Sequence, residues 1–297
     1  MSRSTTFKET RDTIDLFNER FNKNVVTRQQ SMWSTIFKTI KKLEVNDAGD
    51  ILTTNANLKI LRTLRGDVSK TIITPQYKKD LKRFLGGFDE LKGINDVYYQ
   101  TIASGTLNAN KQVFNAITNI SIDATKNSLL EAGLNNELIA PIESILSQNI
   151  TSGAKFTDMV DSLRTDILGN GDKLGKLERY SKQITTDSLN QFNANYNQTV
   201  SQDLGLEFYF YNGAIKDNSR KYCVNRVNEG RYFHKKEVED SASEEWAGKI
   251  PNTNSSSIFI NRGGYNCGHQ WLAVDRALVP SDVIARNIAN GNITADK

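Results

Sequence analysis

The chain changes its hydrophobic period at residues 204–211, which read Leu204-Gly205-Leu206-Glu207-Phe208-Tyr209-Phe210-Tyr211. Before this stretch, apolar and aromatic side chains recur at the three- and four-residue spacing of a helix, at Leu189, Phe192, Tyr196 and Val200. After Gly205, Leu206, Phe208 and Phe210 alternate with Glu207, Tyr209 and Tyr211, which is the period of a strand. The sequence therefore predicts a long helix over residues 174–204, closed by Gly205, and a strand over residues 206–211.

Residues 7–204 are predicted to be mostly helical. The first helix is expected over residues 7–45, where apolar residues keep helical spacing up to a break at Gly49. Pro75 and Pro141 suit the first turn of a helix, and Gly133 suits a helix end. Further helices are predicted over residues 58–68, 76–85, 89–106, 110–131, 141–148 and 157–168.

After residue 205 the pattern favours short strands. Besides 206–211, strands are predicted over residues 230–234, 257–260 and 270–274, with a surface insert between 240 and 257 and a short helix after Pro280. The expected fold class is α+β, with a mostly α-helical N-terminal body and a small mixed α/β C-terminal module. The predicted domains are a helical body over residues 1–173, the module over residues 174–280 and a tail over residues 281–297.

Composition excludes some classes of protein. The chain has 297 residues, 38 basic and 34 acidic side chains and a mean hydropathy of −0.51. No apolar run approaches the roughly 18–20 residues that cross a bilayer, so no membrane segment is expected. The N-terminus has no apolar segment of a secretory signal, which predicts synthesis in a cytoplasm.

Two short basic clusters stand out within this balanced charge. They are Lys38, Lys41 and Lys42, and Lys78, Lys79, Lys82 and Arg83. Solvated helix faces explain them more simply than contacts with DNA phosphates, but a DNA-binding module remains an alternative.

Both cysteines and both histidines lie between Cys223 and His269, after 222 residues that contain neither type. Residues i and i+2 of a strand point to one face, so Cys267 and His269 can share one ion, with Gly268 giving backbone room. Cys223 and His234 would complete a tetrahedral set for a structural zinc ion. The alternatives are two buried cysteines with two unrelated histidines, and a Cys223–Cys267 disulfide.

A catalytic metal would need an open coordination position and a nearby carboxylate, for which Asp217, Glu237 and Glu239 are candidates. The chain has no His-Glu-x-x-His motif and no glycine-rich phosphate loop before a helix. We therefore expect no enzymatic activity and no small-molecule substrate. A metal-dependent enzyme or toxin-like effector is the alternative.

The residues ahead of the first cysteine form a second motif, Asp217-Asn218-Ser219-Arg220-Lys221-Tyr222-Cys223. Asp217 is expected to cap the turn into a short helix, which leaves Arg220 to pair with Asp217 or with a backbone carbonyl. The simpler alternative is a plain surface turn.

Over residues 180–277 the chain resembles the C-terminal module of phage minor head proteins, the Mu protein F-like family of head morphogenesis factors. The family pattern is a long helix, a strand with a bulky aromatic, Asp-x-x-Arg-x-x-Cys, a glycine, and Asn-Cys-Arg-Cys or Asn-Cys-Arg-His. The matching positions are the helix with Asn190, Asn193 and Asn197, the strand at 206–211, Asp217 to Cys223, Gly230, and Asn266-Cys267-Gly268-His269. Arg262-Gly263-Gly264-Tyr265 replaces the family's Pro-x-His, and Gly268 replaces its arginine.

This resemblance implies a virion protein present in few copies at the portal vertex of a phage head. Its expected role is head assembly, DNA packaging or genome delivery, with portal or capsid proteins as partners and packaged DNA as a possible one. The helices would dock on the portal or capsid ring, while the C-terminal module stays rigid.

Overall fold

A computed structural model describes residues 3–102 and 111–294 of the chain. The chain forms two compact units, each built from separate stretches of sequence. The sheet unit comprises Met1–Asp15, Gly87–Ser121 and Thr186–Lys297, and the helical unit comprises Leu16–Gly86 and Ile122–Thr185. The sequence predicted one boundary, at residue 173. In the structure each unit combines separate stretches of the chain, and the boundaries between the units fall within four helices.

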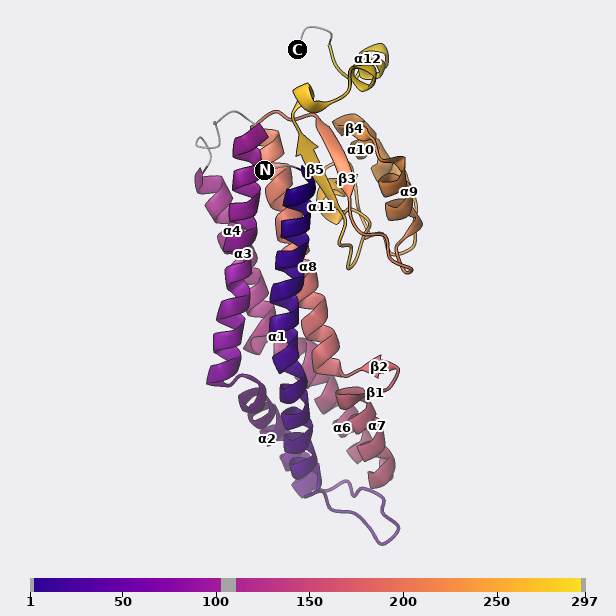
Figure 1. Ribbon diagram of the computed structural model, residues 1–297. Helices are drawn as coiled ribbons and strands as arrows, with labels where there is room; N and C mark the ends of the chain where they lie inside the picture. Colours follow the sequence, from indigo (N-terminus) through magenta and orange to yellow (C-terminus); the bar gives the residue numbers. More distant parts are fainter. Residues whose placement is uncertain (1–2, 103–110, 295–297) are drawn as a thin grey trace. The chain divides into compact units, whose positions relative to one another are not determined.

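Helices dominate both units, as the sequence predicted (Figure 1). The elements of the first half of the chain are α1 (Arg3–Ile40), α2 (Asn55–Ile72), α3 (Pro75–Ile102), α4 (Lys111–Leu129), α5 (Glu131–Leu134), the π-helical turn η1 (Asn135–Ile139), α6 (Ala140–Ser152) and α7 (Phe156–Leu168). The second half contains β1 (Gly169–Asn170), β2 (Lys173–Leu174), α8 (Lys176–Asp203), β3 (Phe208–Asn212), α9 (Lys221–Glu229), β4 (Tyr232–His234), α10 (Lys235–Asp240), η2 (Ser241–Ser243), α11 (Ile258–Asn261), β5 (Gln270–Val274), η3 (Arg276–Leu278) and α12 (Ser281–Ala289).

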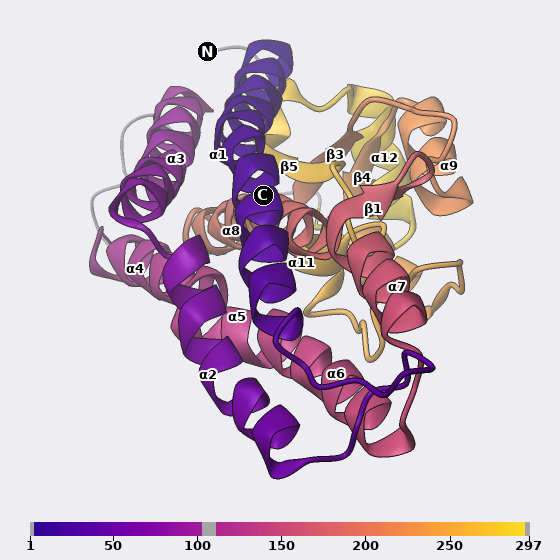
Figure 2. The same cartoon turned by 90° about the horizontal axis from the view of Figure 1, so that it is seen from below.

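Aromatic and polar contacts join α1, α3 and α8 within the helical unit. Phe21 packs against Tyr77 and Phe84, with ring centroids 5.6 and 5.4 Å apart. The buried amide of Asn22 donates to Thr185 Oγ1 at 3.0 Å and accepts from Ser181 Oγ at 2.8 Å. In the same unit α2 runs beside α6 (Figure 2).

Several predicted helix boundaries were wrong. One helix, α3, replaces the two expected over 76–85 and 89–106, because buried Phe84, Phe88 and Leu91 give the chain one continuous apolar stripe across Gly86. The helix expected from Pro141 is preceded by α5 and by the wide turn η1. Because Pro141 has no backbone N–H, the regular hydrogen-bond ladder is interrupted there in any case. Positions 103–106 and 110 lie outside the described residues.

In the sheet unit, β3 is the central strand of an antiparallel sheet in the order β4-β3-β5. Phe208 pairs with His234 on one side and with Val274 on the other, and Tyr211 pairs with Trp271. The strands predicted at 206–211, 230–234 and 270–274 are therefore confirmed. The strand predicted at 257–260 was wrong, because Ile258–Asn261 form the single helical turn α11, whose Ile258 and Phe259 are buried.

A row of asparagines on α8 joins this helix to its neighbours in the sheet unit. Asn193 lies at its centre, accepting from Asn95 at 2.7 Å and donating to Gln270 Oε1 at 2.6 Å. Tyr99 donates to Asn197 Oδ1 at 2.8 Å, and the Arg262 guanidinium donates to the Asn190 carbonyl at 3.0 Å. The polar face that the family resemblance suggested is thus buried and hydrogen-bonded.

No helix among residues 3–102 and 111–294 is both long enough and apolar enough to cross a bilayer.

Candidate metal site

Three of the four predicted ligands meet in the sheet unit. Cys223, Cys267 and His269 are buried, and their ligand atoms all lie within 4.8 Å of one another. The two sulfur atoms are 3.7 Å apart, and Cys267 Sγ is 3.7 Å from His269 Nδ1. Both thiols are free, so the two cysteines touch without forming a disulfide.

These separations fit a tetrahedral ion. Bonds of about 2.3 Å to sulfur and about 2.0 Å to nitrogen at tetrahedral angles place two sulfurs about 3.8 Å apart, and a sulfur and a nitrogen about 3.5 Å apart. The observed 3.7 Å separations are close to both values. The Nδ1 atom of His269 is the ring nitrogen that faces the Cys267 sulfur, so it is the atom available to an ion. The cluster can therefore hold a metal ion.

Separate elements bring the three side chains together. Cys223 lies in the first turn of α9, and Cys267 and His269 lie just before β5. Tyr211, on β3, is the fourth member of the cluster, with its hydroxyl 3.4 Å from Cys223 Sγ and 3.8 Å from Cys267 Sγ. Its ring is stacked on the His269 ring at a centroid distance of 5.7 Å. A strand, a helix and a loop thus converge on one point.

Two glycines provide the space for this convergence. A Cβ atom on Gly263 would lie 2.2 Å from Cys223 Sγ and 3.0 Å from Cys267 Sγ. A Cβ atom on Gly213 would lie 2.1 Å from the His269 ring. Gly268, which was expected to give the room, is exposed, and its Cβ position has nothing within 4 Å. That expectation was wrong because the close approach comes from the neighbouring loops.

The other motif residues fix the loops around the cluster. Arg220 donates to the Tyr265 carbonyl at 2.6 Å, as one of the two expected pairings required. Asn266 has a φ of +55°, a left-handed conformation that asparagine tolerates, and its N–H donates to Asp187 at 3.1 Å. Gly230 has a φ of +56° and ends α9 as its C-cap.

The charge of the thiol pair is unevenly shared. The hydrogen bond from Cys223 holds the pKa of Cys267 well below its usual range, with further stabilisation of the thiolate from His269 and from Arg262. Donating that hydrogen bond, together with burial, raises the pKa of Cys223. Burial raises the pKa of the Tyr211 hydroxyl well above its ordinary value. Within the pair, the surroundings therefore favour a thiolate at Cys267 over one at Cys223.

His234 does not reach the cluster. It pairs with Phe208, three residues along β3 from Tyr211, and three residues of strand span roughly 10 Å. Its Nδ1 accepts the Lys236 N–H at 3.2 Å, and its own N–H donates to Glu237 at 2.8 Å, so that the two residues form a capping box for α10. The inclusion of His234 in the ligand set was therefore wrong, because the side chain caps a helix instead.

The carboxylates weighed for catalysis are also elsewhere. Asp217 is exposed and does not cap α9, since Ser219 closes the turn at 216–219 through its hydrogen bonds with Lys216. Glu237 is engaged with Arg231 and with the N–H of His234, and Glu239 pairs with Lys235 at 3.8 Å. Among the described residues, the metal-binding group contains no carboxylate.

Sequence reasoning missed Tyr211, Gly213 and Gly263. The available signal was weak, because a tyrosine in an aromatic strand and a glycine pair in a loop are common for other reasons. The distances from the Tyr211 hydroxyl to the two sulfur atoms, 3.4 and 3.8 Å, show that the tyrosine reaches the cysteines.

Comparison with known proteins gives no relative: no protein-family model, curated protein or solved structure matches this chain.

Proposed function

We propose that this chain is a minor head protein of a phage particle, acting at the portal vertex in head assembly, DNA packaging or genome delivery. In this proposal a structural zinc ion, bound by Cys223, Cys267 and His269, fixes the sheet unit. The observation that carries it is the convergence of the motif residues. Cys223 ends the first motif and Cys267 belongs to the last. Although 43 residues separate them in the sequence, their sulfur atoms are in contact.

A structural role for the ion is favoured over a catalytic one. The cluster is buried on three sides by β3, α9 and the loop before β5, and Cys223, Cys267 and His269 are each no more than 6% exposed. A catalytic ion needs a position that substrate or water can enter. Asp217, Glu237 and Glu239 are not part of the metal-binding group. We therefore propose binding to portal or capsid proteins, without enzymatic activity.

Mass spectrometry of purified phage particles tests this proposal, with tailless heads and the host cell lysate as comparisons. The chain is expected in purified heads at a few copies for each portal ring, together with stoichiometric zinc in the recombinant protein. Its absence from particles, with abundant chain left in the host lysate, would contradict the virion assignment. A metal-free recombinant protein would contradict only the zinc assignment.

Charge distribution supports a second candidate function, contact with packaged DNA. Residues 16–86 carry 14 Lys and Arg against six Asp and Glu, a net charge of +8, whereas the rest of the chain carries 24 against 28. All of residues 16–86 belong to the helical unit. A polyanion such as DNA would therefore be attracted to residues 16–86 and not to the rest of the chain.

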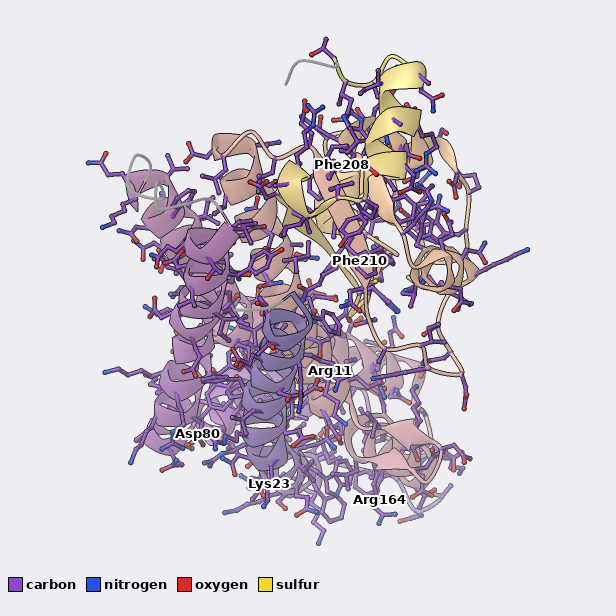
Figure 3. All side chains as sticks on the ribbon, turned by 45° about the horizontal axis from the view of Figure 1, so that its top comes forward. Arg11, Lys23, Asp80, Arg164, Phe208 and Phe210 are labelled. Atoms are coloured by element: carbon purple, nitrogen blue, oxygen red, sulfur yellow. The ribbon has the colours of Figure 1, made fainter. Side chains whose placement is uncertain are left out.

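The exposed lysines of α3 are the best candidates for phosphate contacts. Lys78, Lys79 and Lys82 are exposed, and within the described part of the chain none has a carboxylate oxygen within 4 Å. The neighbouring turn of α1 adds Lys23, and Asn24 of that turn donates to Asp80 at 3.1 Å (Figure 3). Asp80 is itself buried and lies 3.8 Å from Arg83, so its nearest positive partner is Arg83 rather than these lysines.

Salt-dependent binding to a DNA duplex separates this function from a purely protein-binding one. Each phosphate contact contributes about 0.9 to the slope of log affinity against log salt. Replacing Lys78, Lys79 and Lys82 with Gln should therefore reduce the slope by about two to three. A matched variant replaces Lys216, Lys221 and Lys236, which are exposed in the sheet unit, and should leave the slope unchanged. Equal slopes in both variants would exclude α3 as the DNA contact.

A further inference from the structure

We propose that the hydroxyl oxygen of Tyr211 is the fourth ligand of the metal ion held by Cys223, Cys267 and His269. This assignment rests on the zinc site proposed above and specifies how that site is completed. Three protein ligands leave a structural zinc one short of its usual four. The question is therefore which group occupies the remaining corner of the tetrahedron.

The distances place Tyr211 at that corner. Oxygen ligands bind zinc at about 2.0–2.2 Å, so an oxygen and a sulfur on one tetrahedral ion lie about 3.5 Å apart. The Tyr211 hydroxyl is 3.4 Å from Cys223 Sγ and 3.8 Å from Cys267 Sγ. The distance from its oxygen to each sulfur is thus similar to the 3.7 Å distance between the two sulfurs.

The tyrosine is held in this position. It lies on the central strand β3, is 1% exposed, and pairs with Trp271 across the sheet, whose ring centroid is 4.5 Å from its own. The His269 ring is parallel to the Tyr211 ring, with 6° between the planes. A side chain that is buried and packed against two rings cannot swing away to admit a different ligand without disturbing the sheet.

Other candidate groups near the cluster are excluded by their positions. Gly263 has no side chain and so offers no ligand atom, although a Cβ atom there would lie close to both sulfur atoms and 3.6 Å from the Tyr211 hydroxyl. Asp187 accepts the Asn266 N–H and is not part of the metal-binding group, and His234 caps α10. Among the described residues, Tyr211 is the side chain that remains.

Binding of the ion through Cys223, Cys267, His269 and this oxygen releases the Cys223 thiol proton and the phenolic proton to solvent, with no change of oxidation state. Two thiolates and a phenolate leave a zinc centre with one negative charge. The buried guanidinium of Arg262 supplies a compensating positive charge, and its Nε atom has no hydrogen-bond partner among the described atoms. Arg262 therefore offsets part of the negative charge of the site, which Asp187 also faces.

Metal titration of the full-length protein tests the assignment. Metal-depleted protein is titrated with Zn²⁺, and the ultraviolet difference spectrum of a tyrosinate is recorded. Parallel titration with Co²⁺ gives the visible ligand-field bands. One tyrosinate is expected to form for each Zn²⁺ bound. In Tyr211→Phe this signal should vanish, the Co²⁺ bands should shift, and affinity should fall by at least the roughly 10–100-fold that loss of a supporting second-shell partner costs.

Tyr222→Phe is the matched control. Tyr222 is buried beside Tyr211, at a ring distance of 6.1 Å, but its hydroxyl faces Ser241 Oγ at 3.1 Å. This variant should keep the tyrosinate signal and the affinity of the wild type. Zinc binding to the wild type without a tyrosinate signal would overturn the role of Tyr211 as a ligand and leave the zinc site intact. This wild-type result stands even if Tyr211→Phe does not fold. A wild type that binds neither ion would overturn both proposals.

Discussion

Gly263 lets the loop before β5 run directly against the two sulfur atoms. A methyl group at this position would lie 2.2 Å from Cys223 Sγ and 3.0 Å from Cys267 Sγ. Gly263→Ala should therefore push the cysteines apart, lower the free energy of unfolding by about 1–3 kcal/mol and weaken metal binding. Urea unfolding and elemental zinc analysis measure the two effects.

Gly268→Ala is the control for this substitution. Gly268 lies between Cys267 and His269 in the same motif, yet its Cβ position is open and its φ is not in the left-handed range. The variant should behave like the wild type in both measurements. Equal losses in the two variants would mean that the motif is sensitive to any added methyl group, and that the close approach at Gly263 has no special role.

Substitutions of the two histidines should have different effects on zinc binding. His269→Gln removes a ligand atom that lies 3.7 Å from Cys267 Sγ, so zinc should be lost from the purified protein. His234→Gln removes only the cap of α10, which costs about 1 kcal/mol, and should retain zinc. Zinc per chain, measured on both variants, decides between the three-residue set and the four-residue set predicted from the sequence.

At the residue scale, the sequence located part of the site. The clustering of cysteines and histidines and the i, i+2 spacing of Cys267 and His269 were sufficient to find the centre. His234 was misplaced because one-dimensional proximity does not distinguish a ligand from a helix cap. Tyr211 and Gly263 could not be found, because their roles depend on the contacts between three separate elements.

At the scale of the elements, α3 contains an exposed glycine, Gly86, within a continuous helix. The Cβ position of Gly86 has nothing within 4 Å. Gly86→Ala should therefore stabilise the protein by about 0.5–1 kcal/mol by restricting the unfolded chain. Thermal unfolding gives the measurement. A loss of stability would indicate that the helix needs a glycine hinge at this position.

The cap of α10 should make stability depend on pH. Burial lowers the pKa of His234, so the folded protein holds this proton less tightly than the unfolded chain does. The stability from the neutral imidazole is fully present above the unfolded pKa of about 6.5 and is lost as pH falls below it. His234→Ser keeps a capping oxygen that does not titrate between pH 5 and 8. Its unfolding free energy should fall less between these values than that of the wild type, and equal slopes would exclude His234 as the source.

Elements with a clear period were predictable and short ones were not. The alternation at 206–211 and the apolar run at 270–274 correspond to β3 and β5, where most residues of β3 and all five residues of β5 are buried. Residues 257–260 supply only three consecutive apolar residues, which fit a strand or a helical turn equally. The packing of Phe259 against Tyr209, at 4.7 Å between ring centroids, selects the helix.

At the scale of the whole molecule, the fold class was predictable and the units were not. Composition and period indicate a mostly helical chain with a small sheet near its C-terminus, as observed. The units combine segments that are distant in sequence, such as 87–121 with 186–297, through buried polar contacts like that between Asn95 and Asn193. A linear hydrophobic pattern carries no information about such pairings.

This division predicts where the effect of metal removal should appear. Cys223, Cys267, His269 and Tyr211 all belong to Thr186–Lys297, and hence to the sheet unit. Loss of an ion that joins three elements raises the free energy of that unit alone, because local opening follows cooperative units. Chelation should therefore speed amide hydrogen exchange in β3, α9 and residues 262–274 and leave α2 and α6 at their original rates. Equal acceleration in α2 and α6 would show that the chain unfolds as one cooperative body, in which case the ion stabilises the molecule as a whole.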